Sequence, residues 1–508
     1  MKRFIKYSIF IVIIGAVVII LNNIYTVNKT EYINSWSDSS TVSCFYNEPK
    51  NSLNVLVFGT STNSNGVQPA VIWKEQQITS YNLSTERQYS LAAYYLLMES
   101  LKYQHPDVVI INARWIINKY ETSDGDVEID CDSAALHLTL DNMPLSDVKI
   151  RAAMDIASRS EKQNALDYIF PLYFYHARDD ITEGDFDLSY LSQQHVLKGS
   201  CIHLNANEVS LGSPSIGEND ISDPLHSDFS GLSPTYVKKM IELCKTNDIN
   251  VLLLSLPIAG WDSSKHTAVQ TFADAYDVSY LDMNTEEVSK EIQIDSKTDF
   301  TDGLHENVFG AYKTSSYIAS YLASNFEFNR NLPDGITESF DKSYATYMDC
   351  YKMYQTISVL KNASPLESYL SLIADSEDYV VIISVRDEFS YSLTDKQKDS
   401  LHDLGLRTDY NADIFRYSYI GIIDSGNVIF EKCSPRRLEY EYETSDNTKF
   451  DVISAGFKAG NVSSVLLSKK EYSFNMRGLN IVVFSKKLGL VIDRVSFDTY
   501  AGTDAFRY

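Results

Sequence analysis

The first clear pattern is a long apolar run near the N-terminus. Residues 7–21 carry no charged side chain, and Lys6 is the only charged residue between positions 4 and 25. A helix of about 20 apolar residues is long enough to cross a bilayer. Lys2 and Arg3 precede the run, and cations mark the cytoplasmic side of a span. We therefore expect a single transmembrane signal anchor over residues 4–25, with a cytoplasmic N-terminus and an extracytoplasmic body in the cell membrane.

The alternative is a cleaved signal peptide. It is less favoured because no A-x-A-like cleavage site follows the apolar run. A polar stretch comes next, and it predicts a stalk over residues 26–51.

Apolar strands and amphipathic helices then alternate. Short continuous apolar runs are typical of parallel strands that are covered on both faces. The pattern predicts an α/β domain over residues 52–325, built on a doubly wound parallel sheet. The expected strands are residues 53–58, 107–111, 251–256 and a short one around Tyr280, and the expected helices are residues 90–103, 233–245, which begins with Ser233 and Pro234, and 267–275.

A long insertion interrupts this alternation at about residues 118–230. Segments of this length usually form a lid or the wall of a cleft. A helix is expected within residues 142–160. His176 and Arg178 follow it, and they either line the cleft or belong to a solvated loop.

The C-terminal part has a different pattern. Residues 326–365 are rich in Tyr and Met and predict a helical connector. From residue 366 to residue 508, apolar runs are separated by Gly, Asn and Asp, which is typical of β-strands joined by turns. We expect a separate β-rich α+β domain here.

Charge and cysteine content narrow the function classes. The formal net charge is −24, which disfavours a nucleic-acid partner because phosphates would be repelled. No two of the six cysteines form a C-x-x-C pair, so we expect no metal site, and nothing points to a cofactor. The pairing of these cysteines in disulfides stays open.

The candidate chemistry begins where the first strand ends, at Gly59, Thr60 and Ser61. In open parallel sheets, ligands bind beyond the carboxyl ends of the strands. A serine nucleophile needs a base and an orienting carboxylate. Asp302 and His305 supply both near the end of the same α/β unit. The alternatives without catalysis are that Ser61 caps the next segment and that His305 is a structural residue.

This combination resembles the SGNH/GDSL hydrolases over about residues 53–323. The resemblance implies a flavodoxin-like esterase or acyltransferase with Ser61 as nucleophile, His305 as base and Asp302 as its partner. It also implies an oxyanion hole formed by the backbone of Ser61, by Ser84 and by Asn112. Three features depart from the family pattern: Thr60 replaces the usual Asp, Ser84 replaces the expected glycine, and the usual G-x-N-D motif is absent around Asn112.

The C-terminal domain resembles the interleukin-like EMT inducer (ILEI) domain over about residues 366–508. The resemblance implies a compact β-rich fold that recognises ligands, in some members sugars. It is carried by "VIISVRDE" (381–388), "LGL" (404–406), "SAGFKAG" (454–460), "RGLNIVVF" (477–484) and "VSFDT" (495–499).

Taken together, the sequence indicates a membrane-anchored extracytoplasmic serine esterase or O-acyltransferase. Its expected substrate is an ester group on cell-surface polysaccharide, bound with the help of a C-terminal glycan-binding module. For the acyltransferase reading, a membrane-bound acyl donor is the further expected partner. Two alternatives stay open. One is a non-catalytic glycan-binding protein with a decayed SGNH fold, and the other is a surface assembly factor that acts through protein partners.

Overall fold

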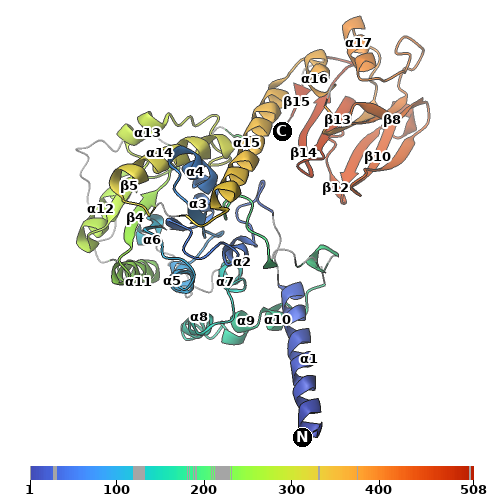
Figure 1. The fold of residues 1–508 in the computed structure, drawn as a ribbon. Helices are drawn as coiled ribbons and strands as arrows, with labels where there is room; N and C mark the ends of the chain where they lie inside the picture. Colours follow the sequence, from blue (N-terminus) through green and yellow to red (C-terminus); the bar gives the residue numbers. More distant parts are fainter. Residues whose placement is uncertain are drawn as a thin grey trace. The chain divides into compact units, whose positions relative to one another are not determined.

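The structure is a computed structural model of the chain. It divides into two compact units, Met1–Tyr354 and Gln355–Tyr508 (Figure 1). The first is a mixed α/β unit and the second is built on a β-sheet, so the expected order of an α/β domain and a β-rich domain is confirmed. The described residues are 2–26, 31–117, 132–179, 181, 183–186, 188, 191–207, 209, 211, 229, 231–329, 332–374, 376–502 and 505–507.

The first helix, α1, runs over Lys2–Tyr25. It exposes large apolar side chains along its length, including Ile9, Phe10 and Val12. Within the described residues, no helix meets the length and apolarity needed to cross a membrane, so the structure does not support the transmembrane span expected over residues 4–25.

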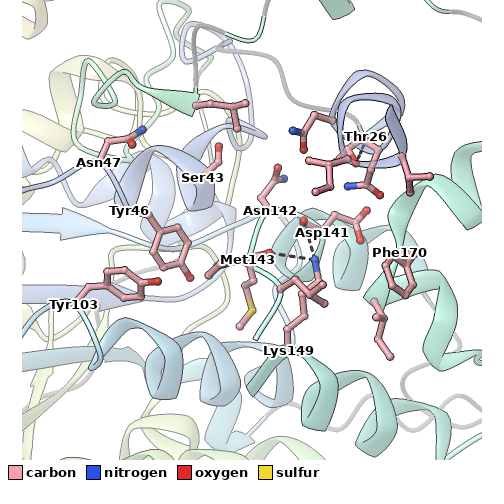
Figure 2. Close-up of a pocket in the computed structure, with 18 residues that line it drawn as sticks. Thr26, Ser43, Tyr46, Asn47, Tyr103, Asp141, Asn142, Met143, Lys149 and Phe170 are labelled. Atoms are coloured by element: carbon pink, nitrogen blue, oxygen red, sulfur yellow. Dashed lines mark hydrogen bonds between the residues drawn. The ribbon is translucent and has the colours of Figure 1, made fainter. Parts of the chain in front are cut away.

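The C-terminal end of α1 packs against the insertion. Leu172 of helix α10 (Pro171–Tyr175) donates its N–H to Asn22 Oδ1 at 3.0 Å. A pocket of about 440 Å³ lies between α1, helix α2 (Thr41–Phe45) and the insertion (Figure 2). Lys149 lines it, and its Nζ donates to the carbonyl oxygens of Asp141 and Met143 at 3.0 and 3.1 Å. Burial lowers the pKa of Lys149 to about 8, but these two carbonyls hold its ammonium group in place.

The stalk expected over residues 26–51 is wrong for its described part, residue 26 and residues 31–51. Val42, Cys44 and Phe45 are buried in the α/β unit. Asp38 is also buried, and its carboxylate accepts from His195 Nε2 at 3.1 Å. Polar composition suggested exposure, but in the structure the polar side chains have partners inside the unit.

The centre of the α/β unit is a five-stranded parallel sheet with the order β2-β1-β3-β4-β5. The expected strands and helices are present with ends shifted by a few residues. One detail differs: the helix expected from Ser233 begins at Leu232 and is capped by Gly231. The strands are β1 (Val55–Phe58), β2 (Ser80–Asn82), β3 (Val108–Asn112), β4 (Asn250–Ser255) and β5 (Ser279–Asp282).

Helices follow the strands and cover both faces of this sheet (Figure 1). In chain order, the helices of this unit after α2 are α3 (Ser61–Gly66), α4 (Pro69–Gln76), α5 (Ser90–Ser100), α6 (Arg114–Ile117), α7 (Ser133–Leu140), α8 (Asp147–Ala157), α9 (Ala165–Ile169), α10, the 3-10 helix η2 (Glu183–Phe186), α11 (Leu232–Thr246), α12 (Ser263–Tyr276), α13 (Glu286–Ile292) and α14 (Val308–Asn325).

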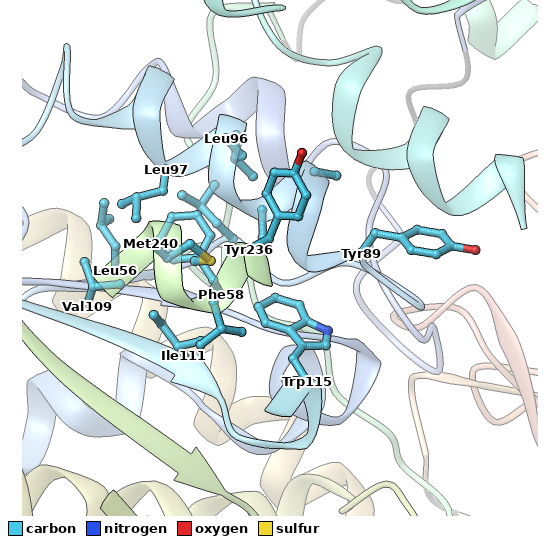
Figure 3. Close-up of a cluster of buried hydrophobic side chains, with 14 of the residues drawn as sticks. Leu56, Phe58, Tyr89, Leu96, Leu97, Val109, Ile111, Trp115, Tyr236 and Met240 are labelled. Carbon is cyan, nitrogen blue, oxygen red and sulfur yellow. The ribbon is translucent and has the colours of Figure 1, made fainter. Parts of the chain in front are cut away.

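The apolar core explains why strand β1 is apolar at every position. Leu56 and Phe58 of β1 point to one face and pack with Leu96 of α5 and Met240 of α11 (Figure 3). The alternate residues of β1 point to the other face, where α4 and α14 cover them. Each such side chain contributes about 1.5–3 kcal/mol when it is fully buried. The core therefore fixes the sheet edge at which β1 ends.

Helix α15 (Ile336–Asn362) lies where a helical connector was expected, and the boundary between the units falls within it. The second unit has a ten-stranded sheet whose main path is β12-β11-β10-β6-β13-β14-β15. Its elements are α16 (Leu366–Ile373), β6 (Tyr379–Asp387), α17 (Asp395–Asp403), β7 (Ser418–Asp424), β8 (Asn427–Ser434), β9 (Leu438–Glu443), β10 (Lys449–Gly456), the 3-10 helix η4 (Phe457–Ala459), β11 (Val462–Leu467), β12 (Lys470–Glu471), β13 (Gly478–Ser485), β14 (Leu490–Phe497) and β15 (Ala505–Phe506).

A buried ion pair ties the N-terminal segment to the rest of the α/β unit. Lys198 Nζ lies 2.9 Å from Glu48 Oε1, and the two side chains are 1% and 0% exposed. The same ammonium donates to Ser339 Oγ at 2.6 Å and lies over the ring of Phe340. Lys198 thus joins residues that are far apart in the sequence.

We predict that Lys198→Met destabilises the protein by about 3–5 kcal/mol, because it leaves the Glu48 carboxylate buried and unpaired. The double variant Lys198→Met/Glu48→Leu should recover most of the loss, since both charges are then gone. Thermal and denaturant unfolding of the two variants measure this. Equal stability of wild type and Lys198→Met would show that the ion pair does not hold the segment.

Candidate active site

Three side chains expected to act together lie within hydrogen-bond distance of one another. His305 Nε2 is 2.8 Å from Ser61 Oγ, and His305 Nδ1 is 2.8 and 3.0 Å from the two carboxylate oxygens of Asp302. Because Nδ1 faces a carboxylate, it carries the ring proton in the neutral imidazole, which leaves Nε2 as an acceptor for the serine hydroxyl. This is the geometry of a nucleophile, a base and an orienting carboxylate.

Ser61 owes its position to the sharp exit from β1. Helix α3 begins at Ser61 with Thr60 as its N-cap, so the serine stands at the strand end. A Cβ atom on Gly59 would come within 2.3 Å of Asn63 Oδ1. Glycine is therefore needed for the chain to turn this tightly into α3. This requirement explains why the apolar strand is followed by a residue without a side chain.

The carboxylate and the histidine come from one short turn. Thr301 donates its N–H to the His305 carbonyl at 2.9 Å, which closes the turn. Asp302 Oδ1 accepts the N–H groups of Leu304 and His305 at 2.8 and 3.0 Å. The carboxylate is thus held by the backbone as well as by the imidazole, and both partners are fixed before any substrate binds.

The electrostatics favour a neutral base beside an ionised carboxylate. Partial burial raises the pKa of Asp302, but the N–H of Leu304 and the neighbouring His305 outweigh it, so this pKa lies below its usual value. Burial lowers the pKa of His305, and this effect outweighs the opposite influence of Asp302. The imidazole is therefore neutral at neutral pH and able to accept a proton.

The oxyanion-hole residues implied by the resemblance have mixed positions. Asn112 ends β3, next to β1 in the sheet, and its Nδ2 donates to Thr60 Oγ1 at 3.4 Å, so its amide lies beside the strand end that carries Ser61. The N–H of Ser84 instead donates to Asn82 Oδ1 at 3.1 Å. The expected donor role of Ser84 is not supported, because its N–H already donates to the buried side-chain oxygen of Asn82.

The residues expected to line the cleft from the insertion lie elsewhere. His176 is exposed, and its Nδ1 contacts the carbonyl of Tyr173. Arg178 pairs with Asp185 at 2.9 Å and donates to the carbonyl of Tyr25 at the end of α1. No described contact links either residue to Ser61 or His305: His176 is exposed, and Arg178 joins the insertion to the end of α1.

Two aromatic residues beside the base were missed from the sequence. The ring of Trp36 lies 4.2 Å from that of His305 and 4.4 Å from that of His203. Asn65 Nδ2 donates both to the Trp36 carbonyl at 3.2 Å and to the Ser61 carbonyl at 2.8 Å. Trp36 belongs to the segment that was expected to be a stalk, and no local sequence signal links it to a histidine 269 positions later.

His203 is a part of the insertion that does reach the site. Burial lowers its pKa to about 4, and His305 contributes to the shift. Its Nε2 is buried and has no hydrogen-bond partner among the described residues. His203 is therefore a neutral imidazole from the insertion that packs against Trp36 beside the site.

A cation also lies near the base. Arg114 Nη1 is 3.4 Å from Thr62 Oγ1, one residue after Ser61, and its charge lowers the pKa of His305. Glu86 acts on the same pKa in the opposite direction. Arg114 lies two residues after Asn112, which ends β3. Its place just beyond the carboxyl end of a parallel strand is the sequence signal that could have identified it as a site residue.

The described residues contain no cluster of His, Cys, Asp or Glu able to hold a metal ion. Among the described cysteines, Cys201, Cys244 and Cys433 are free thiols. Cys131 lies outside the described residues. A comparison of the chain with protein-family models and with curated proteins found no match.

We predict that Trp36→Ala raises the pKa of His305 toward the usual histidine value of about 6.5, because the indole keeps water from the imidazole and burial is the main cause of the low pKa. Trp36→Phe, which keeps an aromatic ring, is the matched control. An NMR titration of the His305 ring measures both values. An unchanged pKa in Trp36→Ala would show that the indole does not shield the base.

Proposed function

We propose that this protein is a serine esterase or O-acyltransferase that acts on ester groups of cell-surface polysaccharide. The observation that carries the proposal is the hydrogen-bonded chain from Ser61 through His305 to Asp302. The strand order β2-β1-β3-β4-β5 is that of flavodoxin-like folds, which supports kinship with SGNH hydrolases.

The proposed reaction has two halves. Ser61 Oγ attacks the ester carbonyl while His305 Nε2 takes the hydroxyl proton, and the imidazolium then gives this proton to the departing alkoxide. In the second half, water or a sugar hydroxyl attacks the acyl-serine, His305 takes its proton, and the proton returns to Ser61. Asp302 orients the imidazole throughout and stabilises its charged form.

Charge develops on the carbonyl oxygen during both attacks. Donors aimed at this oxygen contribute about 10²–10³ in rate each. Ser61's own N–H is the first donor in the proposal. Arg114 supports it with a positive charge near the reacting atoms, which compensates for the engaged N–H of Ser84.

The alternative is a non-catalytic binding protein with a decayed site. The engaged N–H of Ser84 favours it, because one expected oxyanion donor is lost. The intact hydrogen bonds around His305 favour the enzyme, since a decayed site has no need to keep a base aligned on a serine.

We predict that Ser61→Ala lowers turnover of a simple acetyl ester by several orders of magnitude, and that His305→Ala matches it, because a nucleophile and its base act as a unit. Asp302→Asn should cost less, since the serine and the base survive. Ser320→Ala, an exposed serine of α14, is the matched control. Steady-state kinetics with unfolding curves for each variant separate chemistry from stability. Turnover of Ser61→Ala above about a tenth of wild type contradicts the enzyme.

Membrane attachment through α1 is part of the proposal. The described helix does not reach the apolarity of a membrane span, and it is the exposed apolar side chains along it that support attachment. We predict that the full chain requires detergent for release from membranes, whereas a chain that begins at Glu31 is soluble and folded. A chain that begins at Ser52 should be much less stable, because it lacks Trp36 and the Glu48 partner of Lys198. Fractionation and thermal unfolding measure this. Release of the full chain by high salt alone contradicts the anchor.

A further inference from the structure

The second unit carries an exposed ladder of planar side chains. In spatial order it consists of Phe457, Arg416, Phe415, Tyr391, Tyr500 and Arg477. The Arg416 guanidinium lies 4.2 Å from the ring centre of Phe457 and 5.0 Å from that of Phe415. The Tyr391 ring lies 5.9 Å from Phe415 and 5.3 Å from Tyr500, and Arg477 lies 4.8 Å from the ring centre of Tyr500.

The sheet topology brings these residues to one edge. Strand β10 runs parallel to β6, whereas β7 and β13 run antiparallel to it. The residues that follow β6 and β10 therefore meet those that precede β7 and β13. Tyr500 joins them because β14 is antiparallel to β13.

The aromatic members face solvent rather than the core. Tyr391 is 69% exposed, Phe457 49%, Phe415 42% and Tyr500 38%. Exposed aromatic residues gathered in one row are uncommon on a monomer unless they bind something. The described unit has its apolar core elsewhere, around Ile382, Ile422 and Val482.

The backbone under the ladder is held in an unusual conformation. Asp387 and Arg416 both have positive φ angles, 64° and 63°, which cost energy in residues other than glycine. The buried carboxylate of Glu388 accepts the N–H groups of Tyr391, at 3.1 Å, and of Arg416. One buried acid thus fixes the loops that carry two members of the ladder, so the row is preorganised.

The charges around the ladder cancel. Arg386, Arg416 and Arg477 stand against three carboxylates, Asp387, Glu388 and Asp498, and Arg477 pairs directly with Asp498 at 2.7 Å. The whole chain has a formal net charge of −24. An anionic polymer therefore gains little at this edge and is repelled at longer range.

We propose that this ladder is the binding site for an uncharged polysaccharide strand. This inference rests on the glycan-binding role that the sequence predicts for the second unit as part of the proposed action on polysaccharide, and it deepens that role. Aromatic rings offer apolar faces on which sugar rings stack, and the guanidinium and carboxylate groups beside them exchange hydrogen bonds with sugar hydroxyls. A row of such groups matches a linear chain of sugars rather than a single small molecule.

The test uses the full-length protein in detergent and isothermal titration with three uncharged hexasaccharides, chitohexaose, cellohexaose and mannohexaose, and with a hexamer of mannuronic acid as the anionic probe. We expect one of the uncharged probes to bind. Tyr391→Ala and Tyr500→Ala should each weaken it by up to about tenfold, the value of one aromatic stacking contact. Ile429→Ala removes an exposed apolar side chain from β8, outside the ladder, and should change nothing. Thermal unfolding confirms that each variant is folded.

The possible results distinguish an error about the binding site from an error about glycan binding itself. If a sugar binds equally well to wild type and to both tyrosine variants, the ladder is not the site, although the glycan-binding role survives. If only the mannuronic acid hexamer binds, and salt abolishes it, the uncharged class is wrong. If no probe binds the folded protein, this inference and the glycan-binding role both fail, whereas ester turnover at Ser61 is judged separately.

Discussion

The hydrogen bond between Ser61 and His305 is the constraint around which the α/β unit is arranged. It joins residues 244 positions apart in the sequence. The bond exists only because β1 lies inside the sheet, so that its carboxyl end opens toward the turn that carries Asp302 and His305. The apolar core on both faces of β1 fixes the position of that strand end. Gly59 lets the chain turn there without a clash. Packing far from the chemistry therefore determines whether the serine meets its base.

The N-terminal segment is the second determinant of the site. His195 Nδ1 accepts the N–H groups of Leu197 and Gly199, so Nε2 carries the proton and donates to buried Asp38. This contact and the Glu48 pair with Lys198 fasten the segment that places Trp36 against the base. Burial keeps the imidazole neutral, and if Trp36 contributes to that burial as predicted, the packing of the N-terminal segment is linked to the protonation state of His305.

The sequence was most informative where a pattern has a local cause. The apolar strands were recognisable because both faces of a parallel sheet are buried, and Asp302 and His305 because one turn holds both. Contacts that depend on distant residues could not be predicted. Trp36 and His203 meet His305 only in the folded chain, and the engagement of the Ser84 N–H depends on the rotamer of Asn82. The stalk was predicted wrongly because polar residues with buried partners, such as Asp38, look like exposed ones in a sequence.

The most direct test of the account is the rate at which a fluorophosphonate probe labels the protein as pH is varied, with the labelled residue identified by peptide mass spectrometry. Only neutral imidazole can accept the Ser61 proton, and the pKa of His305 lies below its usual value of about 6.5. We predict that Ser61 alone is labelled, and that the rate rises with pH through a midpoint below about 6.5 and is constant near neutral pH. Labelling of another serine, or a rate that ignores the ionisation of His305, would contradict a nucleophile activated by this base.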